Sequence, residues 1–176
     1  MKFIFISIKI IFLYFISFSS SYSIEAPNIK NLIIYEEKQK IKFFDFLNEA
    51  GNKVNLKDFK SELIILNFWA TWCAPCREEM PSLDILQSNK NFQDLIVLPI
   101  NVGKENKEKA KKFFNDLQIK NLKLYYDDSV KLANTFSLIG LPTTIFIDKD
   151  GDEFARIIGS VDFEDQNFIK WLSNYN

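Results

Sequence analysis

Short apolar runs alternate along the chain with stretches in which apolar residues recur every three or four positions. Runs of the first kind are typical of buried strands, and the second spacing is typical of helices that cover a sheet. The pattern predicts strands at 63–69, 95–102, 122–125, 143–148 and 153–158. It predicts helices at 73–88, 104–117 and 129–136 and in the last segment, which carries Phe163, Phe168, Ile169 and Leu172 inward.

Proline and short polar residues refine the helix boundaries. Pro75 suits the first turn of the helix that starts at Cys73, because its missing N–H would have no partner there. Pro81 is expected to kink the same helix by removing an internal hydrogen bond. Ser129 and Asp162 are expected to cap the helices that follow them.

The acidic segment 148–152 lies between the last two predicted strands. Its Lys-Asp-Gly-Asp sequence predicts a tight hairpin turn. The acidic residues also hint at a calcium loop, but Glu153 stands where the EF-hand pattern needs glycine. We therefore interpret the segment as a turn and expect no metal site in the chain.

The residues before the first buried strand follow a weaker pattern. Phe44 and Phe46 alternate with polar neighbours ahead of Val54, which predicts a hairpin. Residues 24–40 fit either a linker or a weakly paired edge strand, and we take them as a linker before a single domain at 41–176. Strands that alternate with helices and close with a hairpin and one more helix predict an α/β fold, in which a mixed sheet carries helices on both faces.

Residues 1–23 have the layout of a targeting segment. Lys2 precedes an apolar stretch at 10–16, and Ser21 and Ser23 offer small residues before a cut. The alternative is an uncleaved membrane anchor, although the run from Phe3 to Phe18 falls short of the ~20 apolar residues of a membrane span. In both cases the domain is expected outside the cytoplasm, in the periplasm or attached to the outer face of the inner membrane.

Composition excludes several function classes. With 22 basic and 23 acidic residues the formal net charge is −1, which does not fit a general nucleic-acid binder. The sequence contains no histidine, which leaves no Cys-His nucleophile pair and no Cys/His zinc site. Any cysteine chemistry must therefore proceed without imidazole.

The two cysteines of the chain, Cys73 and Cys76, form a Cys-x-x-Cys pair. A disulfide that closes so short a loop stabilises little, so a redox role fits better than a structural one. At the start of a helix the Cys73 thiolate is favoured by the helix dipole and by unpaired backbone N–H groups. Cys76 lies one turn deeper and is expected to resolve the mixed disulfide. The alternative is a pair of inert buried thiols.

Two motifs carry a resemblance to the thioredoxin superfamily. Residues 67–76, Asn-Phe-Trp-Ala-Thr-Trp-Cys-Ala-Pro-Cys, resemble its active-site stretch, and 140–144, Gly-Leu-Pro-Thr-Thr, resemble its second hallmark. The resemblance implies a cis proline beside the dithiol, preceded by a residue whose backbone pairs with a substrate strand. The substrate contacts expected on this basis come from Trp72, Ala74, Pro75, Leu141 and Pro142. Trp69 fits either the core or a surface that guides partners.

A narrower resemblance, over residues 42–172, is to the exported TlpA/ResA-like branch. The long segment 103–140 resembles the added β-α insertion of that branch, 76–81 resembles its extension of the motif, and an export signal is usual for it. The branch implies a reductase of envelope proteins, such as cytochrome c precursors or copper-site assembly proteins, that is re-reduced by a membrane donor. It needs no cofactor beyond the Cys73–Cys76 disulfide.

One departure from cytoplasmic thioredoxin concerns proton transfer. Asn67 stands where thioredoxin carries an acidic residue beneath the dithiol, so another proton acceptor is wanted. Glu79 lies three residues beyond Cys76 on the same helix flank and matches a glutamate of the TlpA/ResA-like branch. We hypothesise that Glu79 takes or relays the Cys76 proton. The alternative is a solvated acid that the helix dipole favours.

Two other functions are compatible with the motif. A disulfide-forming oxidant of the same fold would use the same pair, and the Ala-Pro dipeptide between the cysteines does not settle the direction. A metallochaperone would bind a soft ion through two thiolates, but it needs further ligands, and the chain offers no histidine and only two methionines. The sequence therefore favours a thiol-disulfide oxidoreductase.

Overall fold

The computed structural model describes residues 26–102, 105–127, 129 and 131–176, so the predicted targeting segment lies outside the described residues. The strands are β1 (Leu32–Lys40), β2 (Asp45–Asn48), β3 (Lys53–Asn55), β4 (Leu63–Trp69), β5 (Leu95–Val102), β6 (Tyr125–Asp127), β7 (Thr143–Asp148) and β8 (Asp152–Ile158). The α-helices are α1 (Ala74–Gln87), α2 (Lys107–Asp116), α3 (Lys131–Thr135) and α4 (Gln166–Leu172), and short 3₁₀ turns are η1 (Leu56–Asp58) and η2 (Ser173–Tyr175).

The described strands form one mixed sheet in the order β1-β8-β7-β4-β5-β6-β2-β3. β4 lies at its centre, parallel to β5 and antiparallel to β7. All seven residues of β4 are buried, as expected for a strand covered on both faces. The chain therefore leaves the middle of the sheet directly before Cys73.

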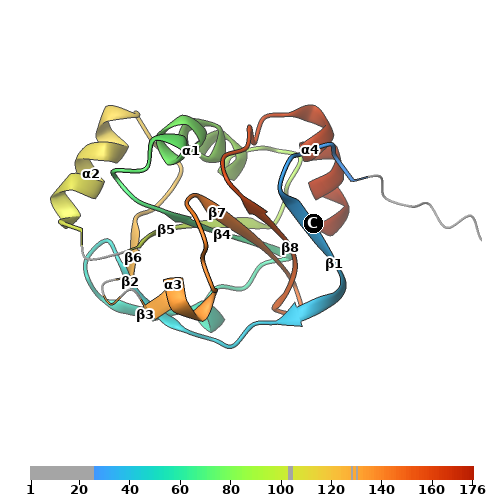
Figure 1. Ribbon diagram of the computed structural model, residues 1–176, viewed down its shortest axis with the longest axis horizontal. Helices are drawn as coiled ribbons and strands as arrows, with labels where there is room; N and C mark the ends of the chain where they lie inside the picture. The colour runs from blue at the N-terminus through green and yellow to red at the C-terminus, as the bar shows by residue number, and fades with distance from the viewer. Residues whose placement is uncertain (1–25, 103–104, 128, 130) are drawn as a thin grey trace, which may run out of the picture.

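Helices cover both faces of the sheet, as the sequence predicts. α1 and α4 lie on one side and α3 on the other (Figure 1). Ala110, Phe113 and Phe114 of α2 belong to the same core cluster as the buried residues of α1 and α4. Leu132 and Phe136 pack with the opposite cluster, together with Leu56 of η1.

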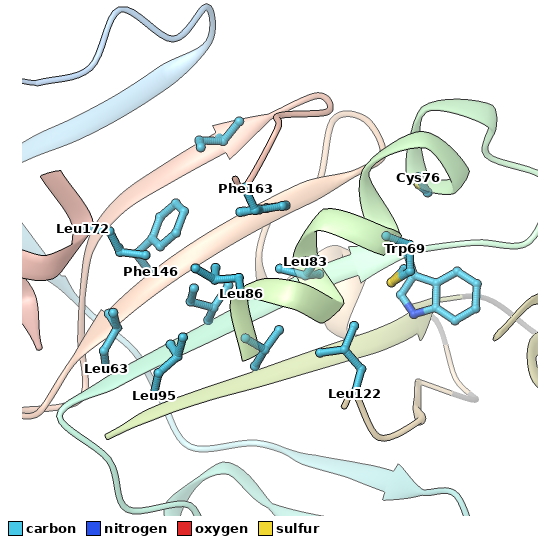
Figure 2. Close-up of a cluster of buried hydrophobic side chains, with 14 of the residues drawn as sticks. Leu63, Trp69, Cys76, Leu83, Leu86, Leu95, Leu122, Phe146, Phe163 and Leu172 are labelled. Carbon is cyan, nitrogen blue, oxygen red and sulfur yellow. The ribbon is translucent and has the colours of Figure 1, made fainter. Parts of the chain in front are cut away.

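The larger core cluster extends from the middle of the sheet to the dithiol. Leu83 and Leu86 of α1 pack over the sheet, and Trp69 and Cys76 lie at one end of the cluster in Figure 2. Burying a leucine side chain contributes roughly 1.5–3 kcal/mol, so α1 is held firmly at the position where it carries the cysteines. Pro81 does not end α1, which continues to Gln87.

The predicted strands 63–69, 95–102 and 143–148 are confirmed. The prediction of a strand at 122–125 is wrong, because pairing begins only at Tyr125. Leu122 and Leu124 are buried as in a strand, but the Leu122 amide donates to the Asp84 carboxylate instead of a neighbouring strand. The alternation of apolar residues at 122–125 reflects the burial of their side chains and not the pairing of a strand.

Two predicted helix caps are wrong. Asp127, not Ser129, accepts from the Leu132 amide at 2.8 Å and from the Ser129 amide and hydroxyl. Asp165, not Asp162, caps α4 by accepting from the Phe168 amide at 2.8 Å. In each case two polar residues near the helix start fit the cap pattern, and the path of the preceding chain decides between them.

The prediction of a linker is wrong for Leu32–Lys40, which forms the edge strand β1. This strand runs antiparallel to β8, with Leu32 opposite Ile157. Ion pairs from Lys38 to Asp148 and from Lys40 to Asp152, both 2.6 Å, hold its second half. An edge strand needs apolar residues on one part of one face only, so its sequence pattern is weak.

The predicted hairpins are confirmed. β2 and β3 pair antiparallel with Phe46 opposite Val54. β7 and β8 enclose a turn in which Gly151 has a φ of 82°, a conformation that glycine adopts without strain. No helix in the described part of the chain is long and apolar enough to cross a membrane.

Candidate active site

The dithiol lies where the central strand passes into α1. Cys73 is the N-cap residue of α1, and its amide donates to the Ala70 carbonyl at 3.2 Å, which closes a tight turn after β4. Cys73 and Cys76 form a disulfide with Sγ atoms 2.07 Å apart. Cys73 is 4% exposed and Cys76 is 0% exposed. Both cysteines are buried, and Cys73 is the more exposed of the two; its place as the attacking sulfur stays a prediction.

The helix start favours negative charge on Cys73. The Cys76 amide donates to the Cys73 Sγ at 3.2 Å, and in the reduced protein the same sulfur would be the thiolate. Hydrogen bonding and the positive end of the helix dipole both stabilise a thiolate more than a thiol. The backbone of α1 is thus arranged to activate the first cysteine.

The second motif lies beside the end of β4. Phe68 is paired with Thr143, so the preceding residue, Pro142, lies beside Trp69 at the edge where the dithiol is found. The Leu141–Pro142 peptide bond is cis. The Thr143 hydroxyl donates to the Gly140 carbonyl at 2.8 Å and fixes the entry into β7. Pro142 is buried and Leu141 is half-buried.

Apolar side chains are exposed in the two segments that carry the motifs. Trp72 is 72% exposed and Ile139 is 82% exposed, and Ala74 and Pro75 are exposed beside Cys73. The sequence analysis missed Ile139, although an apolar residue two positions before a Leu-Pro motif was a usable signal. Trp69 is fully buried against Phe113, with ring centroids 4.6 Å apart, so it belongs to the core.

Glu79 is buried, with 3% of its surface exposed, so the alternative of a solvated acid does not hold. Its carboxylate accepts from Asn67 Nδ2 at 2.8 Å and from the Val161 amide at 3.3 Å. Burial raises the pKa of Glu79 to about 8, against the lowering effect of these two hydrogen bonds. A carboxyl group in this pKa range can exchange a proton with a thiol, whose ordinary pKa is about 8.5.

Asn67 connects Glu79 to the sheet. Its Nδ2 donates to Glu79 and also to Thr144 Oγ1 at 3.0 Å. Its Oδ1 is buried and, among the described residues, has no hydrogen-bond partner. When Glu79 is protonated its O–H needs an acceptor, and the Asn67 amide can supply one by exchanging its oxygen and nitrogen positions. An asparagine here is thus compatible with both protonation states of Glu79.

A cavity of about 380 Å³ opens beside Glu79. It lies between the first turns of α1 and the loop before α4, and Glu79, Pro81, Ser160 and Val161 are among the residues that line it. Water in such a cavity would connect the buried carboxyl group with solvent. Glu79 therefore has a route by which it can lose and regain protons.

The acidic segment 148–152 forms a turn and no metal site. Asp148 accepts from the amides of Asp150 and Asp152 at 3.0 Å, so the suspected calcium loop is a hairpin turn. Among the described residues, histidine, cysteine, aspartate and glutamate form no group of three that could hold a metal ion.

The fold and the dithiol together define a thioredoxin-like protein with a paired-cysteine site. The chain belongs to the AhpC/TSA family, whose pattern matches residues 38–152. The resemblance to the thioredoxin superfamily and its ResA-like branch is confirmed by the relatives that follow.

Two curated relatives are similar to this chain over its central part. The thiol-disulfide oxidoreductase ResA of Bacillus cereus is 35% identical over 109 residues, which are 62% of each protein. The thioredoxin-like protein YneN of Bacillus subtilis is 35% identical over 118 residues, 66% of this chain and 68% of YneN. The chain thus covers somewhat less than two thirds of the ResA relative's length.

Solved structures show the same fold. A DsbF homologue from Corynebacterium diphtheriae superimposes with a TM-score of 0.70 at 28% identity, over 85% of this chain and 96% of the homologue. A secreted thiol-disulfide isomerase from Corynebacterium glutamicum gives a TM-score of 0.69 at 28% identity, over 85% of this chain and 95% of the isomerase.

Proposed function

We propose that the protein is an exported thiol-disulfide oxidoreductase that reduces disulfides of cell-envelope proteins through Cys73 and Cys76. The observation that carries the proposal is the helix-capping Cys73, whose Sγ accepts the Cys76 amide while Cys76 lies fully buried behind it. This arrangement supplies an activated attacking sulfur and a shielded resolving sulfur, the two groups that disulfide exchange needs.

The reaction proceeds in two exchanges. The Cys73 thiolate attacks one sulfur of the substrate disulfide, which forms a mixed disulfide and releases the other substrate sulfur as a thiolate. Cys76 then loses its proton and attacks Cys73 Sγ, which releases the second substrate thiolate. The substrate gains two electrons and the Cys73–Cys76 pair is left as the disulfide present in this structure.

Glu79 is proposed to take the proton of Cys76 in the second exchange. It lies three residues beyond Cys76 on α1, its pKa is about 8, and a cavity adjoins it. A general base works best when its pKa lies near the working pH. In thioredoxin an acid beneath the dithiol is placed for this step, and Asn67 occupies that position here.

Substrate proteins are proposed to bind across the loops on either side of Cys73. Trp72, Ala74 and Pro75 provide the surface on the helix side, and the backbone of Leu141 before Pro142 offers strand-like hydrogen bonds. The strong exposure of Trp72 supports this role, because the large indole contacts solvent over most of its surface.

The compartment and partners are proposed from residues 1–23 and from the relatives. One solved neighbour is described as secreted and another, from Streptococcus pneumoniae, as an exposed lipoprotein thioredoxin. We propose export to the periplasm or the outer face of the inner membrane, with anchoring through the N-terminus if residues 1–23 are retained. Cytochrome c precursors or copper-site assembly proteins are the proposed substrates. The proposed electron donor is a membrane protein, and the Cys73–Cys76 disulfide is proposed as the sole redox group of the protein.

A reduction potential tests the direction of the reaction. Equilibration of the purified protein with glutathione should give a value nearer thioredoxin's about −270 mV than the about −120 mV of a strong oxidant such as DsbA. A strongly oxidising value would contradict the reductase direction and favour the disulfide-forming alternative.

Mixed-disulfide trapping tests the substrate class. In the Cys76→Ser variant the complex at Cys73 cannot be resolved, so cysteine-containing exported proteins should be captured. The Cys73→Ser variant is the matched control and should capture none of them. Equal capture by both variants would contradict the assignment of Cys73 as the attacking sulfur.

A further inference from the structure

Glu105, between β5 and α2, reaches back to the loop in front of the dithiol. Its carboxylate accepts three hydrogen bonds: from the Thr71 amide at 3.0 Å, from the Thr71 hydroxyl at 2.5 Å and from Asn101 Nδ2 at 2.6 Å. Two of these donors belong to one residue of the β4–α1 loop. Hydrogen bonds to a charged acceptor are the stronger kind, so Glu105 ties this loop to the end of β5.

Among the described residues, the loop has few other restraints. Thr71 lies two residues beyond Trp69, the last residue of β4, and takes no part in the strand pairing of the described sheet. Trp72 is 72% exposed and gains little from packing. The hydrogen bond from the Cys73 amide to the Ala70 carbonyl closes the turn, but it involves neither Thr71 nor Trp72, which lie between its two ends. The orientation of Trp72 therefore depends on what Thr71 is bonded to.

The other side of the tether is rigid. Asn101 is buried at the end of β5, where it is paired with Trp69. Asn106, directly after Glu105, caps α2 by accepting from the Glu108 amide at 2.8 Å. α2 in turn packs Phe113 against Trp69. A carboxylate held between a strand end and a capped helix can fix a loop with little freedom of its own.

We propose that Glu105 is a positioning residue, which holds the Thr71–Trp72 segment in the orientation that binds protein substrates beside Cys73. Glu105 does not touch the reacting sulfurs, so its effect is confined to substrates large enough to contact Trp72. The inference rests on the proposed oxidoreductase function. It adds that the segment between β5 and α2 shapes the surface to which protein substrates bind.

Kinetics with two kinds of substrate test the proposal. In Glu105→Ala all three hydrogen bonds are lost, and the KM for a protein disulfide should rise about tenfold, since small misplacements of a binding group have large effects. The rate with a small aromatic disulfide should stay within about twofold of wild type, because that substrate needs only the Cys73 thiolate. Glu108→Ala, an exposed acid on the same insertion, is the matched control and should change neither value.

A conservative variant separates tethering from charge. In Glu105→Gln the amide oxygen can accept from the Thr71 amide and Asn101, while the amide nitrogen donates to the Thr71 hydroxyl. The KM for the protein substrate should therefore return to within about threefold of wild type. A KM that stays as high as in the alanine variant would overturn the positioning role in favour of a charge effect.

Fluorine NMR supplies a readout that does not depend on activity. Protein labelled with 5-fluorotryptophan gives one resonance for each of its three tryptophans, and Trp72→Phe identifies the Trp72 signal. Glu105→Ala should shift or broaden that signal and leave the Trp171 signal in place. If Glu105→Ala does not fold, Thr71→Val removes one donor only and should move the Trp72 signal in the same direction.

The outcomes separate the two proposals. An unchanged Trp72 resonance and an unchanged protein-substrate KM in folded Glu105→Ala would overturn the tether. Equal loss of rate with both substrates would also overturn it, because the residue would then act on the sulfurs. If wild-type protein reduces no disulfide the proposed function fails, and the Trp72 resonance still decides whether Glu105 holds the loop.

Discussion

Asn67 Nδ2 donates a 2.8 Å hydrogen bond to Glu79 Oε1, and both side chains are buried. The acid thus lies on the helix that carries the cysteines, and the amide lies on the central strand beneath them. Asn67 stands at the position on the sheet where thioredoxin carries its acidic residue, and here the buried acid is Glu79 on the helix. Because Glu79 follows Cys76 by about one turn of α1, the proposed proton exchange involves the resolving sulfur and not the attacking one.

Replacing Glu79 by glutamine should remove a proton acceptor from the second exchange. We expect resolution of a preformed mixed disulfide at Cys73 to slow about a hundredfold at about pH 8, at the lower end of the range for loss of a general base. The rise of this rate with pH near the pKa of about 8 should disappear. Stopped-flow measurement across this pH range checks both effects.

The control for this experiment is Glu78→Gln, which removes a neighbouring but exposed carboxyl group. It should leave the pH profile as in wild type. If Glu79→Gln resolves the mixed disulfide with the wild-type profile, Glu79 has no part in the proton transfer and its burial is a structural feature only.

Stability should also depend on pH through Glu79. Its pKa is about 8 in the folded protein and near 4.5 when unfolded, so between these values the folded state binds the extra proton. The free energy of unfolding should therefore fall as the pH rises from about 4.5 to about 8, by an amount on the order of a few kcal/mol. Urea titrations of the oxidised protein at a series of pH values measure this change.

Glu79→Gln is uncharged at every pH and should abolish most of that fall. The variant should lie closest to wild type at the acidic end and exceed wild-type stability at the alkaline end. Parallel stability curves for the two proteins across the whole range would contradict the raised pKa.

The sequence was sufficient for the buried strands and the dithiol. β4, β5 and β7 begin and end where the apolar runs do, because a strand covered on both faces needs apolar residues throughout. The dithiol could be predicted from the spacing of Cys73 and Cys76 and from their place after such a strand. Local pattern and global fold agree at these positions.

Other features depend on partners that are remote in the chain and leave no local pattern. The late start of β6 follows from Asp84, 38 positions before Leu122, and the tether of Thr71 follows from Glu105, 34 positions later. β1 was misread because an exposed edge strand is held by backbone pairing and ion pairs. The burial of Glu79 could be suspected but not established, since early-helix acids are commonly solvated.

Ile139 is expected to contact protein substrates. Leu138 and Leu141 pack inward on either side of it, and the loop is fixed by the bond from the Leu138 amide to the Ala133 carbonyl at 2.9 Å. Ile139→Ser should raise the KM for a protein disulfide about fivefold, because part of an apolar side chain is no longer buried on binding. Reduction of a small disulfide should be unaffected.

Ile85→Ser is the matched control, since Ile85 is also an exposed isoleucine but lies on α1 away from the dithiol loops. It should leave both rates unchanged. Equal effects of the two substitutions on the protein-substrate KM would show that Ile139 is not part of a specific surface.

Asp84 should be among the most important polar residues for stability. It is buried on α1, and its carboxylate accepts from the backbone amides of Lys120, Asn121 and Leu122, with distances of 3.2, 2.7 and 2.9 Å to Oδ1. Asp84→Ala leaves these amides without an acceptor, and we expect the free energy of unfolding to fall by about 3 kcal/mol. In contrast, Asp116→Ala removes an exposed ion pair with Lys112 and should change it by less than about 0.5 kcal/mol. Urea denaturation of both variants distinguishes these values. A small effect of Asp84→Ala would mean that the segment 120–122 finds other acceptors, and that α1 is held to the sheet by its apolar side chains alone.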